Sequence, residues 1–195
     1  MISVILPVHL GKYKGAARQP EKKLKRAINS VIEQSYNDWE LIVIADGCET
    51  GASVAFEMLQ EHNAGVYLLP KQRRWSGVPR NYGIRKAKGD IICYLDHDDC
   101  FGINHLQMIA DGFSGDWVFF DDYTYKDGFK QRKCKLKKYC CGTSNIAHKK
   151  GVFWCENNKY GLDDWHFILK LMEYGEPKFI QAEYMVCHIP NKYDI

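Results

Sequence analysis

Long hydrophobic runs, paired cysteines and internal repeats are all missing from this sequence, and each absence excludes a class of protein. No apolar run approaches the roughly 20 residues that a helix needs to cross a bilayer. The first ten residues, MISVILPVHL, lack the basic segment of a secretory signal. The eight cysteines form no C-x-x-C pair, the spacing typical of zinc knuckles and redox motifs, so we expect reduced thiols. A cytoplasmic protein without a transmembrane segment is the expectation.

The chain instead has 195 residues in which short β-branched runs alternate with amphipathic segments. Strands are predicted at 2–8, 39–45, 66–69 and 90–95, with helices at 20–35, 52–62 and 79–88 between them. This alternation is typical of βαβ units, so we predict an α/β fold: a mixed, mostly parallel central sheet with helices on both faces. After residue 100 we expect a helix at 103–113, then a strand at 116–125 and the segment 128–140 as antiparallel additions to the sheet. A helix at 162–175 and a closing strand at 178–189 complete the prediction. The length fits one domain, residues 1–195.

Three carboxylates follow the fourth predicted strand, in the sequence LDHDD. Asp96, Asp98 and Asp99 lie within four residues, and close carboxylates repel one another unless a cation, hydrogen bonds or water offset the cost. A turn with a helix cap needs only one of them. Oxygen ligands suit Mg²⁺ and Mn²⁺, which often bind through one or two carboxylates plus substrate phosphates. The cluster therefore predicts a metal–phosphate site at the carboxyl edge of the sheet, where open α/β sheets bind ligands.

Other polar residues follow neighbouring predicted strands, namely His9, Asp46 and the basic stretch from Lys71. Asp46 precedes a glycine, so it is either part of a strand-ending turn or an acceptor for a ligand N–H. Arg80, near the start of a helix, is a candidate to pair with phosphate.

Two acidic residues open the last predicted helix, Asp163 and Asp164. These two carboxylates are explained equally well by stabilisation of the helix N-terminus and by the role of a general base. A histidine near a chain end is more often packed in a core than bound to an ion, and His188 is the further candidate for a metal ligand.

Several blocks, in this order, resemble the family 2 glycosyltransferases, which have the GT-A fold. They are ISVILPVHL, LKRAINSVIEQSYNDWELIVIADGCETG, GVPRNYGIRKAKGDIICYLDHDD and GLDDWHFILKL. The resemblance implies a metal-dependent enzyme that moves a sugar from a nucleotide-sugar, most often a UDP-sugar, to an acceptor hydroxyl with inversion. The acceptor would be a glycan, a glycolipid or another hydroxyl compound.

The resemblance also implies roles for particular residues. Asp98 and Asp99 would bind Mn²⁺ or Mg²⁺, and Asp164, with Asp163 as the alternative, would be the catalytic base. Residues 1–100 would form the nucleotide-binding half and 101–195 the acceptor side. The nucleotide-sugar would contact Pro7, Val8, His9, Asp46, Arg80, Asn81, Asp96, His97 and Asp98.

Three positions depart from the family pattern: Ala45 stands where the family has an Asp, Cys48 where it has a Ser, and Asp163 where it has a Glu before the base. Because of the first two, nucleoside contacts are expected to differ. Two other functions stay open on the sequence. One is a metal-dependent nuclease or nucleotidyltransferase, and the other a nucleotide-sugar-binding protein without catalysis. A retaining mechanism is open as well.

The basic segment, Lys130–Lys138, places six basic residues in nine, although the net charge of the whole chain is only +3. Its charge density is explained equally well by a solvated surface and by an acceptor that carries phosphate.

Overall fold

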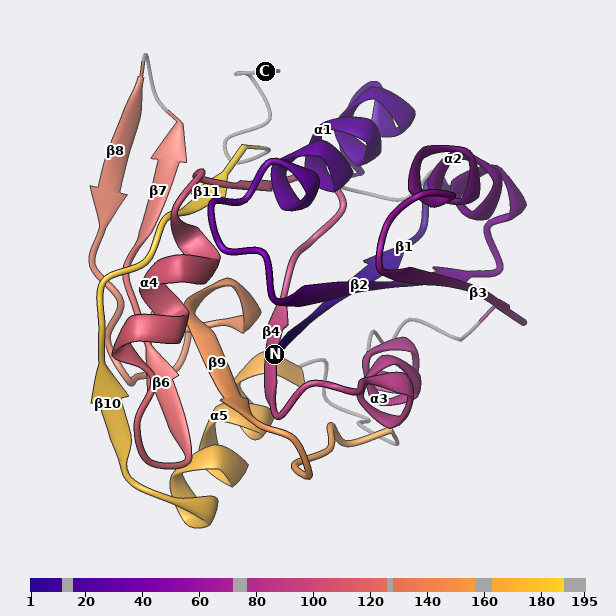
Figure 1. Ribbon diagram of the computed structural model, residues 1–195. Helices are drawn as coiled ribbons and strands as arrows, with labels where there is room; N and C mark the ends of the chain where they lie inside the picture. Colours follow the sequence, from indigo (N-terminus) through magenta and orange to yellow (C-terminus); the bar gives the residue numbers. More distant parts are fainter. Residues whose placement is uncertain (12–15, 72–76, 126–127, 157–162, 188–195) are drawn as a thin grey trace.

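The computed structural model describes every residue except 12–15, 72–76, 126–127, 157–162 and 188–195. Its first half alternates strands and helices, as predicted (Figure 1). These elements are β1 (Ile2–Val8), α1 (Pro20–Ile32), β2 (Trp39–Asp46), α2 (Glu49–Leu59), β3 (Ala64–Leu69), α3 (Gly77–Lys86) and β4 (Ile91–Tyr94).

The second half contains shorter strands, two α-helices and one 3₁₀ helix, η1. These elements are β5 (Cys100–Phe101), α4 (His105–Gly112), β6 (Trp117–Phe119), β7 (Asp122–Tyr125), β8 (Phe129–Arg132), η1 (Thr143–Asn145), β9 (Ile146–Lys149), α5 (Asp163–Tyr174), β10 (Pro177–Phe179) and β11 (Tyr184–Val186). A seven-stranded sheet has the order β10-β6-β9-β4-β1-β2-β3, and a four-stranded sheet the order β5-β11-β7-β8.

The parallel part of the large sheet follows directly from the side-chain pattern of its strands. β1 pairs in parallel with both β2 and β4, and β2 pairs in parallel with β3. Val4 and Leu6 of β1 pack into the core beneath α1 and α2, whereas Ile5 between them packs into the core on the side of α3 and α5 (Figure 1). Alternate residues of a strand point to opposite faces, so a continuous apolar run indicates a sheet covered on both sides. The predicted mixed, mostly parallel α/β sheet is confirmed.

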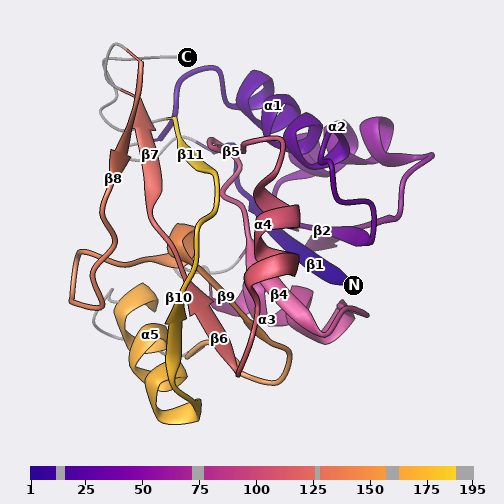
Figure 2. The same ribbon diagram turned by 60° about the vertical axis from the view of Figure 1, so that its left-hand side comes forward.

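Two predicted strands of the second half are wrong in one respect, since each is broken and divided between the two sheets. The segment 116–125 forms β6 in the large sheet and then β7 in the small one, and 178–189 likewise forms β10 and then β11 (Figure 2). Between β6 and β7, the N–H of Phe120 donates to Asn145 O, and the Asn145 side chain donates to Phe120 O. These bonds to η1 end the pairing of β6.

Strand β9 has no counterpart among the predicted elements. It lies antiparallel between β4 and β6 and joins the two halves of the large sheet. Its core residues, Ile146, Ala147 and His148, are followed at once by three polar or glycine residues, and four residues are too few for a clear periodic signal. Within the described residues, no helix is long and apolar enough to cross a membrane.

Candidate active site

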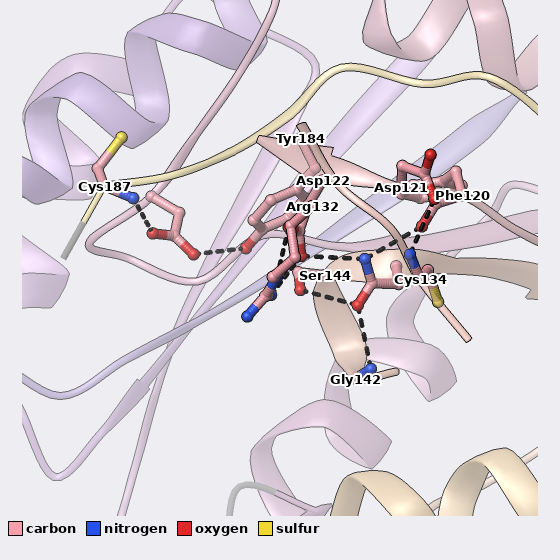
Figure 3. Close-up of polar contacts among 11 residues, drawn as sticks. Phe120, Asp121, Asp122, Arg132, Cys134, Gly142, Ser144, Tyr184 and Cys187 are labelled. Carbon is pink, nitrogen blue, oxygen red and sulfur yellow. Dashed lines mark hydrogen bonds and ion pairs between the residues drawn. The ribbon is translucent and has the colours of Figure 1, made fainter. Parts of the chain in front are cut away.

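The acidic turn after β4 is held in place by the segment that begins with β11. The N–H of Asp96 donates to Tyr184 Oη at 3.1 Å. The same hydroxyl donates to Asp99 Oδ2 at 3.1 Å (Figure 3). The N–H of Cys187 donates to Asp99 Oδ1 at 2.8 Å. Both oxygens of Asp99, which is 2% exposed, therefore accept a hydrogen bond from the protein. Its role as a metal ligand stays a prediction.

Two other members of the acidic turn, His97 and Asp98, are also mostly buried, at 9% and 6% exposure. The carbonyl of Asp98 accepts a hydrogen bond from Arg26 Nη2 at 2.7 Å, which connects the turn to α1. His188 lies outside the described residues, and the described part of the chain contains no group of three His, Cys, Asp or Glu side chains arranged to hold a metal ion.

Arg80 of α3 connects the acidic turn with the start of α5. Its Nη2 donates to Asp96 Oδ1 at 3.1 Å, and its Nη1 lies 3.9 Å from Asp164 Oδ1. Its guanidinium also lies over the ring of Trp154, 4.7 Å from the centroid. Burial alone would lower the pKa of Arg80, but the carboxylates of Asp96 and Asp164 outweigh it, so this pKa is raised. Arg80, Asp96 and Asp164, which the sequence predicted for the site separately, thus lie together.

A pocket of about 630 Å³ opens beside these three residues. Its wall consists of Arg80, Asp96 and Asp164, two residues of the basic segment, Arg132 and Lys133, the turn at 139–145, and Trp165. Within this wall, the Thr143 hydroxyl donates to Asp164 Oδ1 at 3.0 Å, and the Asp164 side chain is 48% exposed. A carboxylate that is both oriented and accessible is suited to accept a proton. Asp163 begins α5, and its side chain lies outside the described part of the structure.

A second group of predicted residues gathers at the ends of β1, β2 and β3. His9 Nδ1 lies 3.2 Å from Asp46 O, and Lys71 Nζ donates to Asp46 Oδ2 at 2.7 Å. Gly47 has φ +57°, and a Cβ there would lie 2.5 Å from Lys71 Cβ. Glycine therefore permits both the turn and the close approach of Lys71. Pro7 and Val8, the last residues of β1, lead into this group.

Asn81 lies apart from both groups in its contacts. Its side chain accepts a hydrogen bond from the N–H of Trp154 at 2.7 Å and donates to Trp154 O and Glu156 Oε1. Asn81 thus ties α3 to the segment that carries Trp154, the aromatic ring beneath Arg80. A contact between Asn81 and nucleotide stays a prediction.

Sequence reasoning missed Tyr184, Trp154, Thr143 and Arg132 as residues that contact or line the site. None of them belongs to a recognisable motif, and each approaches the site from a segment distant in sequence. Only Arg132 gave a signal, as a member of the basic segment.

Comparison with known proteins assigns the family. The model of "Glycosyl transferase family 2" matches residues 3–170. The chain belongs to this family. The prediction of a family 2 glycosyltransferase, made from four sequence blocks, is therefore confirmed, and the nuclease interpretation loses its support.

One relative is the Escherichia coli protein "UDP-Glc:alpha-D-GlcNAc-diphosphoundecaprenol beta-1,3-glucosyltransferase WfgD". It is 28% identical over 109 residues, which are 55% of this chain and 39% of WfgD. Among solved structures, S. aureus TarS in complex with UDP aligns with a TM-score of 0.75 at 18% identity, over 95% of this chain and 60% of that one. The chain thus spans only part of the proteins it matches.

A second solved structure is the mannosyltransferase PcManGT from Pyrobaculum calidifontis in complex with GDP-Man and Mn²⁺. It aligns with a TM-score of 0.64 at 15% identity, over 98% of this chain and 58% of that one. At these identities the likeness shows the fold alone. The GT-A fold is confirmed.

Proposed function

We propose that this chain is the catalytic domain of a metal-dependent glycosyltransferase that transfers a sugar from a UDP-sugar to an acceptor hydroxyl with inversion. One observation carries the proposal: Arg80 brings Asp96 of the acidic turn and Asp164 of α5 to one side of one pocket. Family membership supports the reaction class, and the UDP complex of TarS supports a UDP-sugar as the first donor to test.

Asp164 is the general base in this proposal. The bond between sugar and diphosphate breaks as an acceptor oxygen attacks the anomeric carbon from the opposite face. The proton of that hydroxyl then goes to Asp164. The Thr143 hydroxyl orients the carboxylate by donating to Oδ1, and Arg80 Nη1 lies 3.9 Å from the same oxygen. Asp163, the adjacent residue, is the alternative base.

The acidic turn provides the donor side of the site. Asp98 and Asp99 supply hard carboxylate oxygens, and one or two carboxylates plus substrate phosphates are the usual ligands of Mg²⁺ in such sites. Asp96 contacts the nucleotide-sugar beside them. Bound there, Mn²⁺ or Mg²⁺ would stabilise the charge of the departing diphosphate as a Lewis acid. The Mn²⁺ in the PcManGT complex supports this choice of ion. Asp99, fixed by Tyr184 and Cys187, keeps the turn in position.

The group at the ends of β1–β3 provides the base-binding side. Asp46, held by Lys71, accepts from an N–H of the nucleotide base, and His9 lies against the backbone of Asp46. Ala45, buried in β2, cannot supply the carboxylate that the family has at this position. The nucleoside is therefore held by fewer charged groups.

Thermal unfolding with UDP, GDP and dTDP, each with and without Mn²⁺, tests the donor site. A ligand that binds only the folded state raises the midpoint by mass action. We expect one nucleotide to raise it, only with Mn²⁺, and Asp98→Asn to abolish the effect. Glu156→Gln, a carboxylate change outside the acidic turn, is the control and should keep the response. No shift with any nucleotide would contradict the proposal.

Measuring hydrolysis of the donor, or transfer of its sugar, then distinguishes an enzyme from a protein that only binds the donor. Incubation of the bound UDP-sugar with wild type should slowly release UDP even without an acceptor. A protein that binds donor with Mn²⁺ but never releases UDP from any UDP-sugar would be a binding protein instead.

A further inference from the structure

The basic segment divides into two parts that the sequence does not distinguish. Arg132 and Lys133 form ion pairs with the buried residues Asp122 and Asp121 and also line the pocket beside Asp164. The four other basic residues, Lys130, Lys135, Lys137 and Lys138, form no ion pair with a carboxylate of the described residues and do not line this pocket.

The two carboxylates fix the positions of Arg132 and Lys133. Arg132 donates through Nε to Asp122 Oδ1 at 2.7 Å and through Nη2 to Asp122 Oδ2 (Figure 3). Lys133 Nζ donates to Asp121 Oδ2 at 2.8 Å. The side chains of Asp122 and Asp121 are 0% and 3% exposed, whereas those of Arg132 and Lys133 are 52% and 67% exposed. The anionic end of each pair is thus buried and the cationic end faces solvent.

The buried carboxylates are themselves held by neighbours. Asn145 Nδ2 donates to Asp122 Oδ2 at 3.0 Å, and the N–H of Cys134 donates to Asp121 Oδ1 at 2.8 Å (Figure 3). Asn145 belongs to the same turn that forms the pocket wall. A long flexible side chain normally loses conformational entropy when it binds a ligand. Arg132 and Lys133 are already held by this network in the free protein, so most of that entropic cost does not arise on binding.

Such an arrangement is suited to an anion. A guanidinium that uses Nε and Nη2 for a carboxylate keeps the donors of Nη1, and its planar fork matches phosphate oxygens. Each ion pair is neutral as a whole, but its carboxylate is buried and its cation is exposed, so these two pairs present positive charge at the pocket wall. The pocket's volume of about 630 Å³ is ample for a sugar phosphate.

We propose that Arg132 and Lys133 bind a phosphate group of the acceptor, so that the substrate class is a phosphorylated sugar or sugar-phosphate conjugate. This inference rests on the proposed function, in which Asp164 receives the proton of the acceptor hydroxyl. The donor diphosphate is proposed at the acidic turn after β4, and Asp96 of that turn borders the same pocket. Arg132 and Lys133 come from a different element, β8 and the residue after it, and line the pocket together with Asp164. We therefore assign the anion that they hold to the acceptor, and the comparison with UDP–Mn²⁺ binding tests this assignment against a donor phosphate.

Calorimetric titration of the protein with glucose 1-phosphate tests the inference, with glucose as the uncharged comparison and UDP–Mn²⁺ as the donor-site probe. We expect wild type to bind glucose 1-phosphate more tightly than glucose. Arg132→Lys, which keeps the charge but loses the fork, and Lys133→Gln should each weaken this binding about tenfold. Affinity for UDP–Mn²⁺ should be unchanged in both variants.

Lys137→Gln and Lys138→Gln are the matched controls, because they remove the same charge from the same segment outside the pocket wall. Their affinity for glucose 1-phosphate should stay within about twofold of wild type at physiological salt. Should Arg132→Lys fold poorly, the pair Asp122→Asn/Arg132→Gln removes both charges together and leaves no unpaired buried carboxylate. It should give the same loss of glucose 1-phosphate with UDP–Mn²⁺ binding retained.

Three results would overturn the inference: equal affinity for glucose and glucose 1-phosphate, equal losses in the control variants, or a loss of UDP affinity in Arg132→Lys as large as the loss for glucose 1-phosphate. The last would assign the phosphate to the donor. If UDP fails to bind wild type while glucose 1-phosphate still depends on Arg132, the donor proposal is contradicted and the anion site stands.

Discussion

The two halves of this protein solve the problem of buried polar groups differently. In the parallel half, the buried carboxylate of Glu40 is satisfied mainly by uncharged donors, the Ser3 hydroxyl and the N–H of Gly89. In the second half, the buried carboxylates of Asp121 and Asp122 are paired with cations whose other side faces the pocket. Both arrangements satisfy a buried charge, but only the second also presents charge to a ligand.

This difference indicates that donor binding and acceptor activation belong to different halves of the protein. The parallel half supplies carboxyl-terminal strand ends, which converge because the strands are parallel, and so it places the donor-binding residues. The second half crosses between two sheets and carries the base and the basic wall of the pocket. We therefore expect changes in the two halves to affect donor binding and transfer separately.

The largest expected effect concerns the base. Asp164→Asn removes the proton acceptor, so the rate of transfer from the UDP-sugar should fall about 100- to 10,000-fold. The midpoint shift caused by UDP–Mn²⁺ should persist, because Asp164 belongs to the acceptor side. Initial rates of UDP release measured with acceptor present provide the test, with Asp163→Asn as the companion variant. A larger loss of rate in Asp163→Asn than in Asp164→Asn would assign the role of general base to Asp163.

Ion pairs from the two halves give the next comparison. Arg132→Gln leaves the fully buried Asp122 carboxylate without its cation, and we expect the free energy of unfolding to fall by about 3–5 kcal/mol. Lys71→Gln disrupts a pair whose lysine is 47% exposed and whose aspartate is 10% exposed, so some water can replace the cation and the loss should be smaller, about 1–2 kcal/mol. Urea unfolding of both variants measures the two values. Equal losses would show that burial of the carboxylate does not matter.

Variants of two buried tyrosines, one from each half, distinguish an effect on stability from an effect on ligand binding. Tyr94 Oη contacts His148 Nε2 at 2.7 Å and accepts from Trp154 Nε1 at 3.0 Å, and Tyr184 Oη bridges Asp96 and Asp99. Tyr94→Phe and Tyr184→Phe should each destabilise the fold by about 1–3 kcal/mol.

Only Tyr184→Phe should also weaken the Mn²⁺-dependent response to UDP, because that hydroxyl positions the acidic turn. Normalising the response to the fraction of folded protein gives the control. A weakened response of the same size in Tyr94→Phe would show that the effect is one of general stability.

The last prediction, which needs no ligand, is a pH dependence that belongs to the second half. Burial lowers the pKa of His148 to about 4 and that of His105 to about 3, from 6.5. Below pH 6.5 the unfolded chain binds protons that the folded protein does not, so stability rises with pH in this range. Each histidine should contribute a slope of about 1.4 kcal/mol per pH unit between roughly pH 4 and 6.5.

Unfolding free energies measured from pH 5 to 6.5 test this slope. His148→Gln should lower the slope, whereas His62→Gln, at an exposed position of the parallel half, should leave it unchanged. An unchanged slope in His148→Gln would contradict the assignment.

Much of the parallel half could be read from the sequence because its information is local. Apolar runs predicted β1, β2 and β4, and the spacing of Leu24, Ile28 and Val31 predicted the buried face of α1. The carboxylates after β4 were identified as a site because three of them exceed what a turn requires. Helix starts and ends differ from the prediction by about two to three residues, as for α2 and α3. At α2 the N-cap residue, Cys48, makes no side-chain capping bond, so the sequence carries no signal for the start.

The second half could be predicted only in outline. Its sequence indicated extended segments but gave no sign that Phe120 and Asp121 pass from one sheet to another, since the break depends on hydrogen bonds with Asn145, distant in sequence. For the same reason the sequence predicted that Tyr184 lies in the closing strand but not that it contacts the acidic turn. The basic segment looked uniform, although two of its residues are paired with buried carboxylates and the rest are not.

The sequence by itself determined the class of sheet, the acidic turn and the family, because these follow from periodicity and from motifs only a few residues long. The tertiary structure alone decided that Arg80 lies between Asp96 and Asp164, that Tyr184 holds Asp99, and that Arg132 reaches the pocket. The physical reason is that these contacts join segments distant in the chain, and their geometry depends on how the two sheets and α5 pack together.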